Sequence, residues 1–517
     1  MASLWDNVVN LSDQLPLYKQ DGTPDTHTGG FLVFVLISLV VFAFNTYVNI
    51  RQHVRYSDKE VDQRLLDLVD KLPPIQKSKS NESPTTEAGD AAPEGAEGAD
   101  DDEGNEESIS GNTKPTNASD DKNEEEEEQY ATYKEKIVAK FPASQAYAKD
   151  KSRFGFVRST WGLIQGLVFL FGGFSPFMWD LSGQWMRFVV PQDYCNDTVQ
   201  ACVFVSVTTA IDTIVSLPFA MYSTFVIEHR HGFNKTTLKT FVKDTVLGLL
   251  LQALFGLPIM ALILIIIEQA GDYFFIYVSG AVMLITFFMM SIYPSFIAPC
   301  YNQFDALPDG SLKSKIESLA ATQNFPLTKL FTIDGSKRSA HSNAYLYGFC
   351  NNKRIVLFDT LLRQCDECEI VAILGHEIGH WKMGHTVKNM VVSQLQIFLI
   401  FYSLSFFVGS QTMYHIFGFN DTPTFIGMSL FLECAFTPLN PLLQFFMSYM
   451  TRLYEFQADA YAAKLGHTEH LKVGLVKLQL ENLGALAVDP LYSAYHYSHP
   501  PVVERLRALD EFEKKDA

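Results

Sequence analysis

The residues with the clearest chemical potential occupy positions 376–380, which read His-Glu-Ile-Gly-His, an HExxH motif. The surrounding stretch is largely apolar and is expected to be a helix. Positions i and i+4 lie on one helical face, so His376 and His380 can reach a single Zn²⁺ ion. Glu377 follows the first ligand, where its carboxylate can act as general base toward a metal-bound water. His385 lies off this register and is expected at the surface or beside a ligand. The motif predicts a hydrolytic zinc site; the alternative is a buried helix whose histidines only make hydrogen bonds.

A catalytic zinc also needs a third protein ligand and one open position. A metzincin would place Gly and His where this chain has Met383 and Thr386, which excludes that class. Later in the chain, the string EFQAD spaces Glu455 and Asp459 four residues apart, on one face of an expected helix. We expect Glu455 to be the third ligand and Asp459 to orient one of the two ligand imidazoles. The alternative is an exposed helix on which these acids pair with Arg452.

Seven apolar stretches, each long enough to cross a bilayer, must position these residues. Their approximate bounds are 31–50, 160–180, 201–226, 245–268, 273–300, 391–409 and 424–447. The last two separate the HExxH motif from Glu455, so both parts of the predicted site return to the same side of the membrane. The zinc is therefore expected at the membrane surface, where the substrate would carry an apolar, membrane-seeking part.

Basic residues in the connecting loops predict the orientation of the spans. Lys and Arg gather after the first span, before the second, and between the third and fourth, whereas residues 269–272 and 410–423 contain none. The positive-inside rule then places the N-terminus in the lumen or outside and the C-terminus in the cytosol. The segments 301–390 and 448–517, which carry the predicted site, both face the cytosol.

The chain has 517 residues, of which 47% are hydrophobic, and a net charge of −18. Residues 81–128 hold 18 acidic residues and two lysines, and so account for −16 of that charge. The acidic stretch over 76–129 is expected to be disordered, either as a plain linker or as a polyanion that attracts basic substrates. No basic stretch suits a phosphate backbone, so nucleic acid is not an expected partner.

We expect six segments along the chain. They are a lumenal end with the first span and its cytosolic continuation (1–75), the acidic insertion (76–129), spans two to five (130–300), a cytosolic segment with the HExxH helix (301–390), spans six and seven (391–447), and a cytosolic segment with the EFQAD helix and tail (448–517).

Several long strings resemble the type I integral-membrane CAAX prenyl endoproteases. They are IEHRHGFNKTT (227–237), RSAHSNAYLYGF (338–349), KRIVLFDTLL (353–362), LGHEIGHW (374–381), EFQADAYA (455–462) and SAYHYSHPPVVERL (493–506). The resemblance covers about 130–508 and the first span, and the acidic insertion departs from it. It implies a predominantly α-helical, polytopic membrane fold. Seven transmembrane helices would surround a hydrated chamber, with a cytosol-facing zinc protease domain that contains a small β-sheet.

The resemblance also implies the reaction, which is removal of the aaX tripeptide from a prenylated C-terminal Cys-a-a-X protein by a zinc-bound water. It implies one zinc per chain, held by His376, His380 and Glu455, with Glu377 as base and Asp459 orienting a ligand.

Three further residues receive roles from the same resemblance. The resemblance implies that Asn343 lies in a strand that pairs with the peptide substrate. It also implies that His499 and Arg505 donate hydrogen bonds to the substrate or to its developing oxyanion. The alternatives are a turn residue, a core histidine and a surface ion pair, respectively.

Lys514 and Lys515 near the C-terminus resemble a dilysine retrieval sequence; the alternative is a merely charged tail. The endoplasmic reticulum membrane is therefore the expected location, with the nuclear envelope as an alternative. The expected partners are the prenylated Cys-a-a-X protein or peptide and the lipid bilayer. Two rival functions remain open: a broader quality-control metalloprotease of membrane proteins, and a non-enzymatic channel with a structural zinc.

Overall fold

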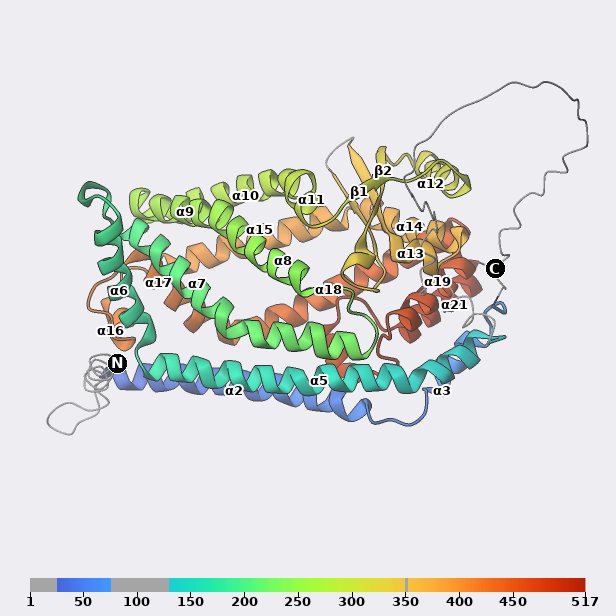
Figure 1. Cartoon of the computed structure of the whole chain (residues 1–517), viewed down its shortest axis with the longest axis horizontal. Helices are drawn as coiled ribbons and strands as arrows, with labels where there is room; N and C mark the ends of the chain where they lie inside the picture. Colours follow the sequence, from blue (N-terminus) through green and yellow to red (C-terminus); the bar gives the residue numbers. More distant parts are fainter. Residues whose placement is uncertain (1–25, 76–129, 349–351, 517) are drawn as a thin grey trace, which may run out of the picture.

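The computed structural model describes residues 26–75, 130–348 and 352–516. Long helices run side by side and make up most of the molecule, while a small sheet and shorter helices gather at one end (Figure 1). The predicted acidic insertion at 76–129 lies outside the described residues. The expected fold class, a predominantly helical membrane protein with a small sheet, is confirmed.

Within the described residues, six helices are long and apolar enough to cross a membrane, and a bent helix pair makes a seventh if it counts as one span. The elements concerned are α2 (Thr26–Arg55), α5 (Tyr133–Phe171), α7 (Asp197–Tyr222), α8 (Leu238–Leu251), α9 (Leu257–Gln269), α10 (Phe274–Ile292), α11 (Ala298–Tyr301), α15 (His385–Leu404), α17 (Thr424–Phe431) and α18 (Thr437–Lys464). Short π-helical turns join α8 to α9, α10 to α11 and α17 to α18. All seven predicted stretches overlap these helices, whereas the side of the membrane that each end faces stays a prediction.

The predicted span over 160–180 differs from the structure in its second half. α5 ends at Phe171, and the chain turns through a glycine pair into the separate helix α6 (Phe174–Val189). Gly173 has a φ of 60°, a left-handed conformation that glycine adopts without steric cost. The glycines therefore stop the helix inside the apolar stretch, which a hydropathy pattern does not reveal.

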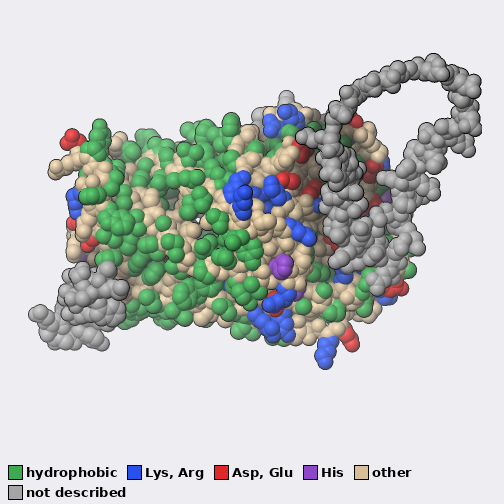
Figure 2. Space-filling model, in the orientation of Figure 1, with side chains coloured by type: hydrophobic (Ala, Val, Ile, Leu, Met, Phe, Trp, Pro, Cys, Tyr) green, Lys and Arg blue, Asp and Glu red, His purple; other side chains and the backbone are tan. Residues whose placement is uncertain are grey.

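The surface of the helical bundle is apolar. Figure 2 shows hydrophobic side chains over the bundle, and charged side chains gathered toward the end that holds the sheet. In the most apolar window of each of the six spans, at most 17% of the residues are buried, so these helices expose most of their apolar side chains. The chamber that the family resemblance implies stays a prediction. At the far end of the bundle lie α6 and the short α16 (Gln411–Ile416) (Figure 1).

The sheet has four strands in the order β1-β2-β4-β3. Their bounds are β1 (Phe304–Ala306), β2 (Leu327–Ile333), β3 (Ala344–Tyr347) and β4 (Lys353–Phe358). β2 and β4 are parallel, and the other two pairs are antiparallel. The centre of β4 is fully buried, as expected for a strand that pairs on both sides. β3 is an edge strand, so one row of its backbone N–H and C=O groups is free to pair with another chain.

Shorter helices complete the end of the molecule that holds the sheet. They are α3 (Gln63–Val69), α12 (Ser311–Thr322), α13 (Asp359–Gln364), α14 (Glu367–Lys382), α19 (Thr468–Glu481), α20 (Pro490–His496) and α21 (Val502–Asp516). One apolar core joins the sheet to α12, α14, α19 and the end of α18. A second core joins α3 and the start of α5 to α19 and α21. Segments from both chain ends and from the middle therefore build this domain together.

We predict that the sheet end faces the cytosol and the α6–α7 loop faces the lumen. The reason is the concentration of Lys and Arg on the loops at the sheet end. In sealed microsomes, added protease should remove an epitope fused after Ala517 and spare an epitope inserted at 191–195 until detergent is added. A lumenal marker protein controls for sealed vesicles, and the reverse pattern of protection would contradict this orientation.

Candidate metal centre

Helix α14, which carries the HExxH motif, has a well-defined beginning. The Asp366 side chain accepts a backbone N–H of the first turn, and the Glu369 carboxylate accepts the backbone N–H of Asp366 at 2.9 Å. This reciprocal capping satisfies two backbone donors that would otherwise lack partners. The apolar side of the helix packs into the core through Ile370, Leu374 and Ile378. The imidazoles of the motif therefore face α18.

Close contact between α14 and α18 brings the HExxH motif and Glu455 together. A Cβ atom added at Gly379 would lie 3.1 Å from Cβ of Tyr461 and 3.2 Å from Cα of Ala458. Any larger residue at 379 would therefore push the helices apart. The glycine inside the HExxH motif is needed for this approach, which sets Glu455 opposite the two histidines.

Three potential ligands converge between the helices. Nε2 of His376 lies 3.1 Å from Nε2 of His380, and the Glu455 carboxylate lies 3.2 Å from the second imidazole and 3.5 Å from the first. Ligand atoms of a tetrahedral zinc site, at about 2.0–2.1 Å from the ion, are about 3.3 Å apart. The three side chains thus occupy three corners of one tetrahedron. Among the described residues, no other group of His, Cys, Asp and Glu meets the same spacing.

The second nitrogen of His376 is held by a buried ion pair. Its Nδ1–H donates to Oδ1 of Asp459 at 2.8 Å, and Asp459 is 1% exposed. Arg505 donates to both oxygens of Asp459, from Nε at 2.8 Å and from Nη2 at 2.6 Å. This arrangement fixes the imidazole with Nε2 directed at the metal position. Asp459 lies where the sequence predicted an orienting carboxylate.

His380 is oriented by another histidine. Its Nδ1 lies 2.9 Å from Nδ1 of His385, whose Nε2 lies 3.0 Å from Oε1 of Gln457. If Nε2 of His380 faces a metal, its Nδ1–H donates to His385, which then donates through Nε2–H to Gln457. The ring of His385 also stacks on Tyr454 at 4.3 Å between centroids. His385 is buried beside a potential ligand. The sequence pattern did not predict the contacts that Gln457 and Tyr454 make with His385.

Glu377 is half-buried beside the converging ligands. Burial raises the pKa of Glu377, and the nearby carboxylate of Glu455 acts in the same direction. A carboxylate with a raised pKa is a better proton acceptor near neutral pH than an exposed one. The position and the basicity of Glu377 both suit a general base.

His499 and Arg505 both approach Glu455, and Arg505 also lies 3.3 Å from Nδ1 of His376 on α14. Nδ1 of His499 is 2.8 Å from Oε2 of Glu455, without the alignment of a hydrogen bond, and the His499 side chain is exposed. The Glu455 carboxylate raises the pKa of His499. Arg505 is buried and directed mainly at Asp459, with Nη1 3.5 Å from Glu455. Their predicted contacts with substrate stay predictions.

Arg452 holds the segment that carries these two residues. The sequence left open whether it pairs with Glu455 and Asp459; its guanidinium instead contacts Ser493 and Glu504, the latter at 2.6 Å. Arg452 lies one turn before Glu455 on α18. It therefore ties the chain around 499 to the helix that supplies the third ligand.

Asn343 immediately precedes the edge strand β3 and is exposed. Its side-chain oxygen accepts the backbone N–H of Ala344 at 2.8 Å, and its carbonyl oxygen accepts the N–H of Phe358 at 3.1 Å. β3 packs against α14, so the free strand edge borders the helix with the HExxH motif. A peptide paired with this edge would run past the converging ligands.

The chain matches two protein families along most of its length. Residues 131–303 match the CAAX prenyl protease N-terminal region with five membrane helices. Residues 306–513 match peptidase family M48. The boundary between the two matches falls at the start of β1, where the long apolar helices give way to the sheet.

Curated relatives and a solved structure are similar to this chain. The CAAX prenyl protease 1 homolog of Arabidopsis thaliana is 47% identical over 380 residues, covering 73% of this chain and 88% of the relative. CAAX prenyl protease 1 of Saccharomyces cerevisiae is 40% identical, covering 72% and 86%. The crystal structure of S. mikatae Ste24p superposes with a TM-score of 0.74 at 34% identity, covering 93% of this chain and 99% of that chain.

We predict that Glu455→Ala lowers bound metal from about one ion per chain to a small fraction of that value. The substitution removes one of three converging ligands and leaves two imidazoles, which bind a divalent ion weakly. Metal content is measured on purified protein by mass spectrometry. The control is Glu469→Ala, which removes an exposed carboxylate elsewhere in the same domain and should leave the metal content unchanged. Full metal occupancy in Glu455→Ala would exclude this residue as a ligand.

Proposed function

The chain belongs to the CAAX prenyl protease 1 family of M48 metallopeptidases, and we propose that it removes the C-terminal aaX tripeptide from prenylated Cys-a-a-X proteins. The observation that carries this proposal is the convergence of His376, His380 and Glu455 beside Glu377, next to a free strand edge. The two histidines and Glu455 can bind a metal, Glu377 can act as a base, and the strand edge can align a peptide.

Zinc is the metal that we propose for this centre. Two imidazole nitrogens and one carboxylate oxygen form a donor set typical of catalytic zinc, and they leave the fourth tetrahedral position free. Oε2 of Glu455 is buried and receives no aligned hydrogen bond from the protein, as expected of an atom that faces a metal. When bound, zinc would acidify a water molecule and polarise the scissile carbonyl group.

Three side chains would then act on the substrate, and a fourth would act through a neighbouring residue. Glu377 takes the proton of the attacking water and passes it to the leaving amine. Asn343 and the free edge of β3 hold the peptide extended across the site. His499, which is exposed above Glu455, is placed to donate to the carbonyl oxygen as charge develops there. Arg505 acts mainly through Asp459, because both of its short bonds go to that carboxylate.

The membrane bundle would bind the prenyl group. The helices that adjoin the protease domain are apolar and long enough to cross a membrane. An isoprenoid chain transferred from water to such surroundings gains roughly 0.8 kcal/mol per buried CH₂ group. We propose the endoplasmic reticulum membrane as the location, with both parts of the site facing the cytosol, where the prenylated substrates reside.

The direct test compares a prenylated Cys-a-a-X peptide with its unprenylated twin. We expect the purified enzyme to release the aaX tripeptide from the prenylated peptide with a kcat/KM at least tenfold higher, because burial of the prenyl group adds binding energy. Mass spectrometry identifies the product. Equal rates on the two peptides would instead favour a broader membrane metalloprotease, and cleavage at other positions would exclude aaX removal.

We predict that Glu377→Gln abolishes turnover while keeping the metal. The amide has the size of the carboxylate but cannot accept the proton of the attacking water, so the rate should fall by at least two orders of magnitude. Metal analysis of the same preparation should still give about one zinc per chain. Activity close to that of the unmodified enzyme would rule out Glu377 as the base.

A further inference from the structure

The string IEHRHGFNKTT (227–237) lies outside the group of converging ligands, but it contacts the segment that leads into β3. An antiparallel β-bridge pairs Asn234 with Ser339. Two backbone hydrogen bonds of 3.1 Å flank this bridge, one from the N–H of Ala340 to the carbonyl of Phe233 and one from the N–H of Lys235 to the next segment. The connection between α7 and α8 is therefore joined to the residues that precede the edge strand.

Arg338, the first residue of that segment, is held from the side of α8. Its guanidinium donates to both oxygens of Asp244, from Nε at 2.8 Å and from Nη2 at 3.0 Å. Its carbonyl oxygen accepts the hydroxyl of Thr236 at 3.1 Å. A two-point contact between a guanidinium and a carboxylate restricts both distance and angle. The segment thus begins from a fixed point on the membrane bundle.

His341 fixes the other end of the segment. Its Nδ1 lies 3.1 Å from Oδ1 of Asn482, and the same oxygen accepts the backbone N–H of Ser342 at 3.2 Å. Because that oxygen is an acceptor, Nδ1 of His341 carries the hydrogen and donates it. The ring also stacks on Phe233, with centroids 4.1 Å apart and planes at 14°. The backbone carbonyl of His341 accepts the hydroxyl of Thr360 at 3.1 Å.

The other ring nitrogen of His341 faces the end of α7. Nε2 lies 3.4 Å from the hydroxyl of Tyr147 and 3.7 Å from the carboxylate of Glu228. Tyr147 is 1% exposed and donates to Glu228 at 2.8 Å. The imidazole therefore lies between the end of a membrane helix and the turn after α19. It cannot shift toward either side without losing a contact on the other.

The edge strand needs such an anchor. β3 has four residues, and among the described strands it pairs with β4 alone. Asn343, at its beginning, follows His341 by two residues. A peptide can pair with the free edge only where the backbone N–H and C=O groups of β3 are held in place, and a misplacement of about 1 Å can cost about a hundredfold in rate.

We propose that His341 is a positioning residue for the substrate, because it fixes the first residues of β3 and, through them, the alignment of the bound peptide. It acts through the strand and not on the reacting atoms. The proposal rests on the proposed function, since it requires a peptide that pairs with β3. It gives the string 227–237 a part in substrate alignment.

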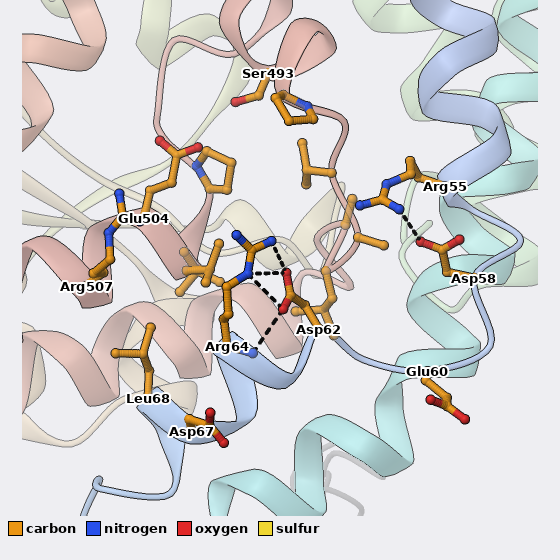
Figure 3. A pocket seen from close by; sticks show the side chains of 18 residues that line it. Arg55, Asp58, Glu60, Asp62, Arg64, Asp67, Leu68, Ser493, Glu504 and Arg507 are labelled. Carbon is orange, nitrogen blue, oxygen red and sulfur yellow. Dashed lines mark hydrogen bonds and ion pairs between the residues drawn. The ribbon is translucent and has the colours of Figure 1, made fainter.

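An ion pair in another cavity of the same domain supplies a control (Figure 3). The cavity lies beside α3 and measures about 540 Å³. In it Arg64 pairs with Asp62 at 2.7 Å. None of the described residues that line this cavity belongs to β3 or to 338–343. Breaking the Arg64 pair should therefore leave the edge strand in place.

The test uses a farnesylated Cys-a-a-X peptide and two analogues, each with an ester in place of one non-scissile amide of the aaX segment. In an antiparallel pair, alternate residues direct their N–H groups at the partner strand, so β3 receives one of the two N–H groups. For the unmodified enzyme we expect kcat/KM to fall roughly two- to tenfold with one ester, the range for a single hydrogen bond, and to change little with the other.

His341→Ala should remove this difference between the esters. On the peptide with all its amides, KM should rise roughly fivefold while kcat stays within about twofold, as expected when binding is lost equally in the ground and transition states. His341→Asn, whose amide can still donate to Asn482, should keep part of the difference. Arg64→Met should behave like the unmodified enzyme. A purely structural role would lower stability or metal content but would leave the two esters unequal.

Two results would overturn the positioning role while leaving aaX removal intact. They are an unchanged ester difference in His341→Ala, and equal cleavage of both esters by the unmodified enzyme. Failure of the unmodified enzyme on the peptide with all its amides would overturn the proposed function instead. Metal content near one ion per chain shows that each variant is folded. If His341→Ala falls short of that value, Asn482→Ala replaces it, because it removes the acceptor shared by His341 and Ser342 and should equalise the esters in the same way.

Discussion

The close contact of α14 with α18 is the constraint on which the rest of the structure depends. The ligands of the proposed metal centre come from two helices that are separated in the chain by two apolar segments. They converge because Gly379 lets the helices approach so closely that a Cβ atom there would require its neighbours to shift by a few tenths of an ångström. A displacement of an ångström would spoil the tetrahedral spacing of three side chains at once, since metal ligands tolerate only a few tenths of an ångström. The apolar core around Ile370 and Leu374 resists that displacement.

Buried charges surround this contact, and each is compensated by a neighbour. Asp459 and Arg505 form a bidentate pair that is almost inaccessible to water. Loss of one partner from such a pair typically costs about 3–5 kcal/mol, because the other charge is left buried without compensation. Burying such an ion pair costs free energy of desolvation. This pair fixes the orientation of the His376 imidazole. His380 is oriented differently, by a neutral imidazole. The two ligands are thus held by independent sets of contacts.

The domain around the centre is assembled from distant parts of the chain, and this arrangement sets a strand and a loop beside the converging ligands. β3 presents a free edge and packs against α14. The segment around His499 is tied by Arg452 to the helix that carries Glu455. A substrate laid along the strand would therefore pass the proposed base and the proposed donor.

Local patterns in the sequence determined the membrane helices and the spacing of the candidate ligands. Hydropathy located stretches that all overlap long apolar helices, and helical periodicity placed His376 with His380 and Glu455 with Asp459, because both depend only on neighbouring residues. The hydropathy pattern did not predict the end of the helix before Gly173. A glycine pair can lie inside an apolar helix, and only its φ angles show that the helix ends there. Only the tertiary structure decided that Arg452 pairs with Glu504, that Arg505 points at Asp459, and that His385 is buried beside His380. These contacts join residues far apart in the chain or on different helices, and no local rule relates such positions.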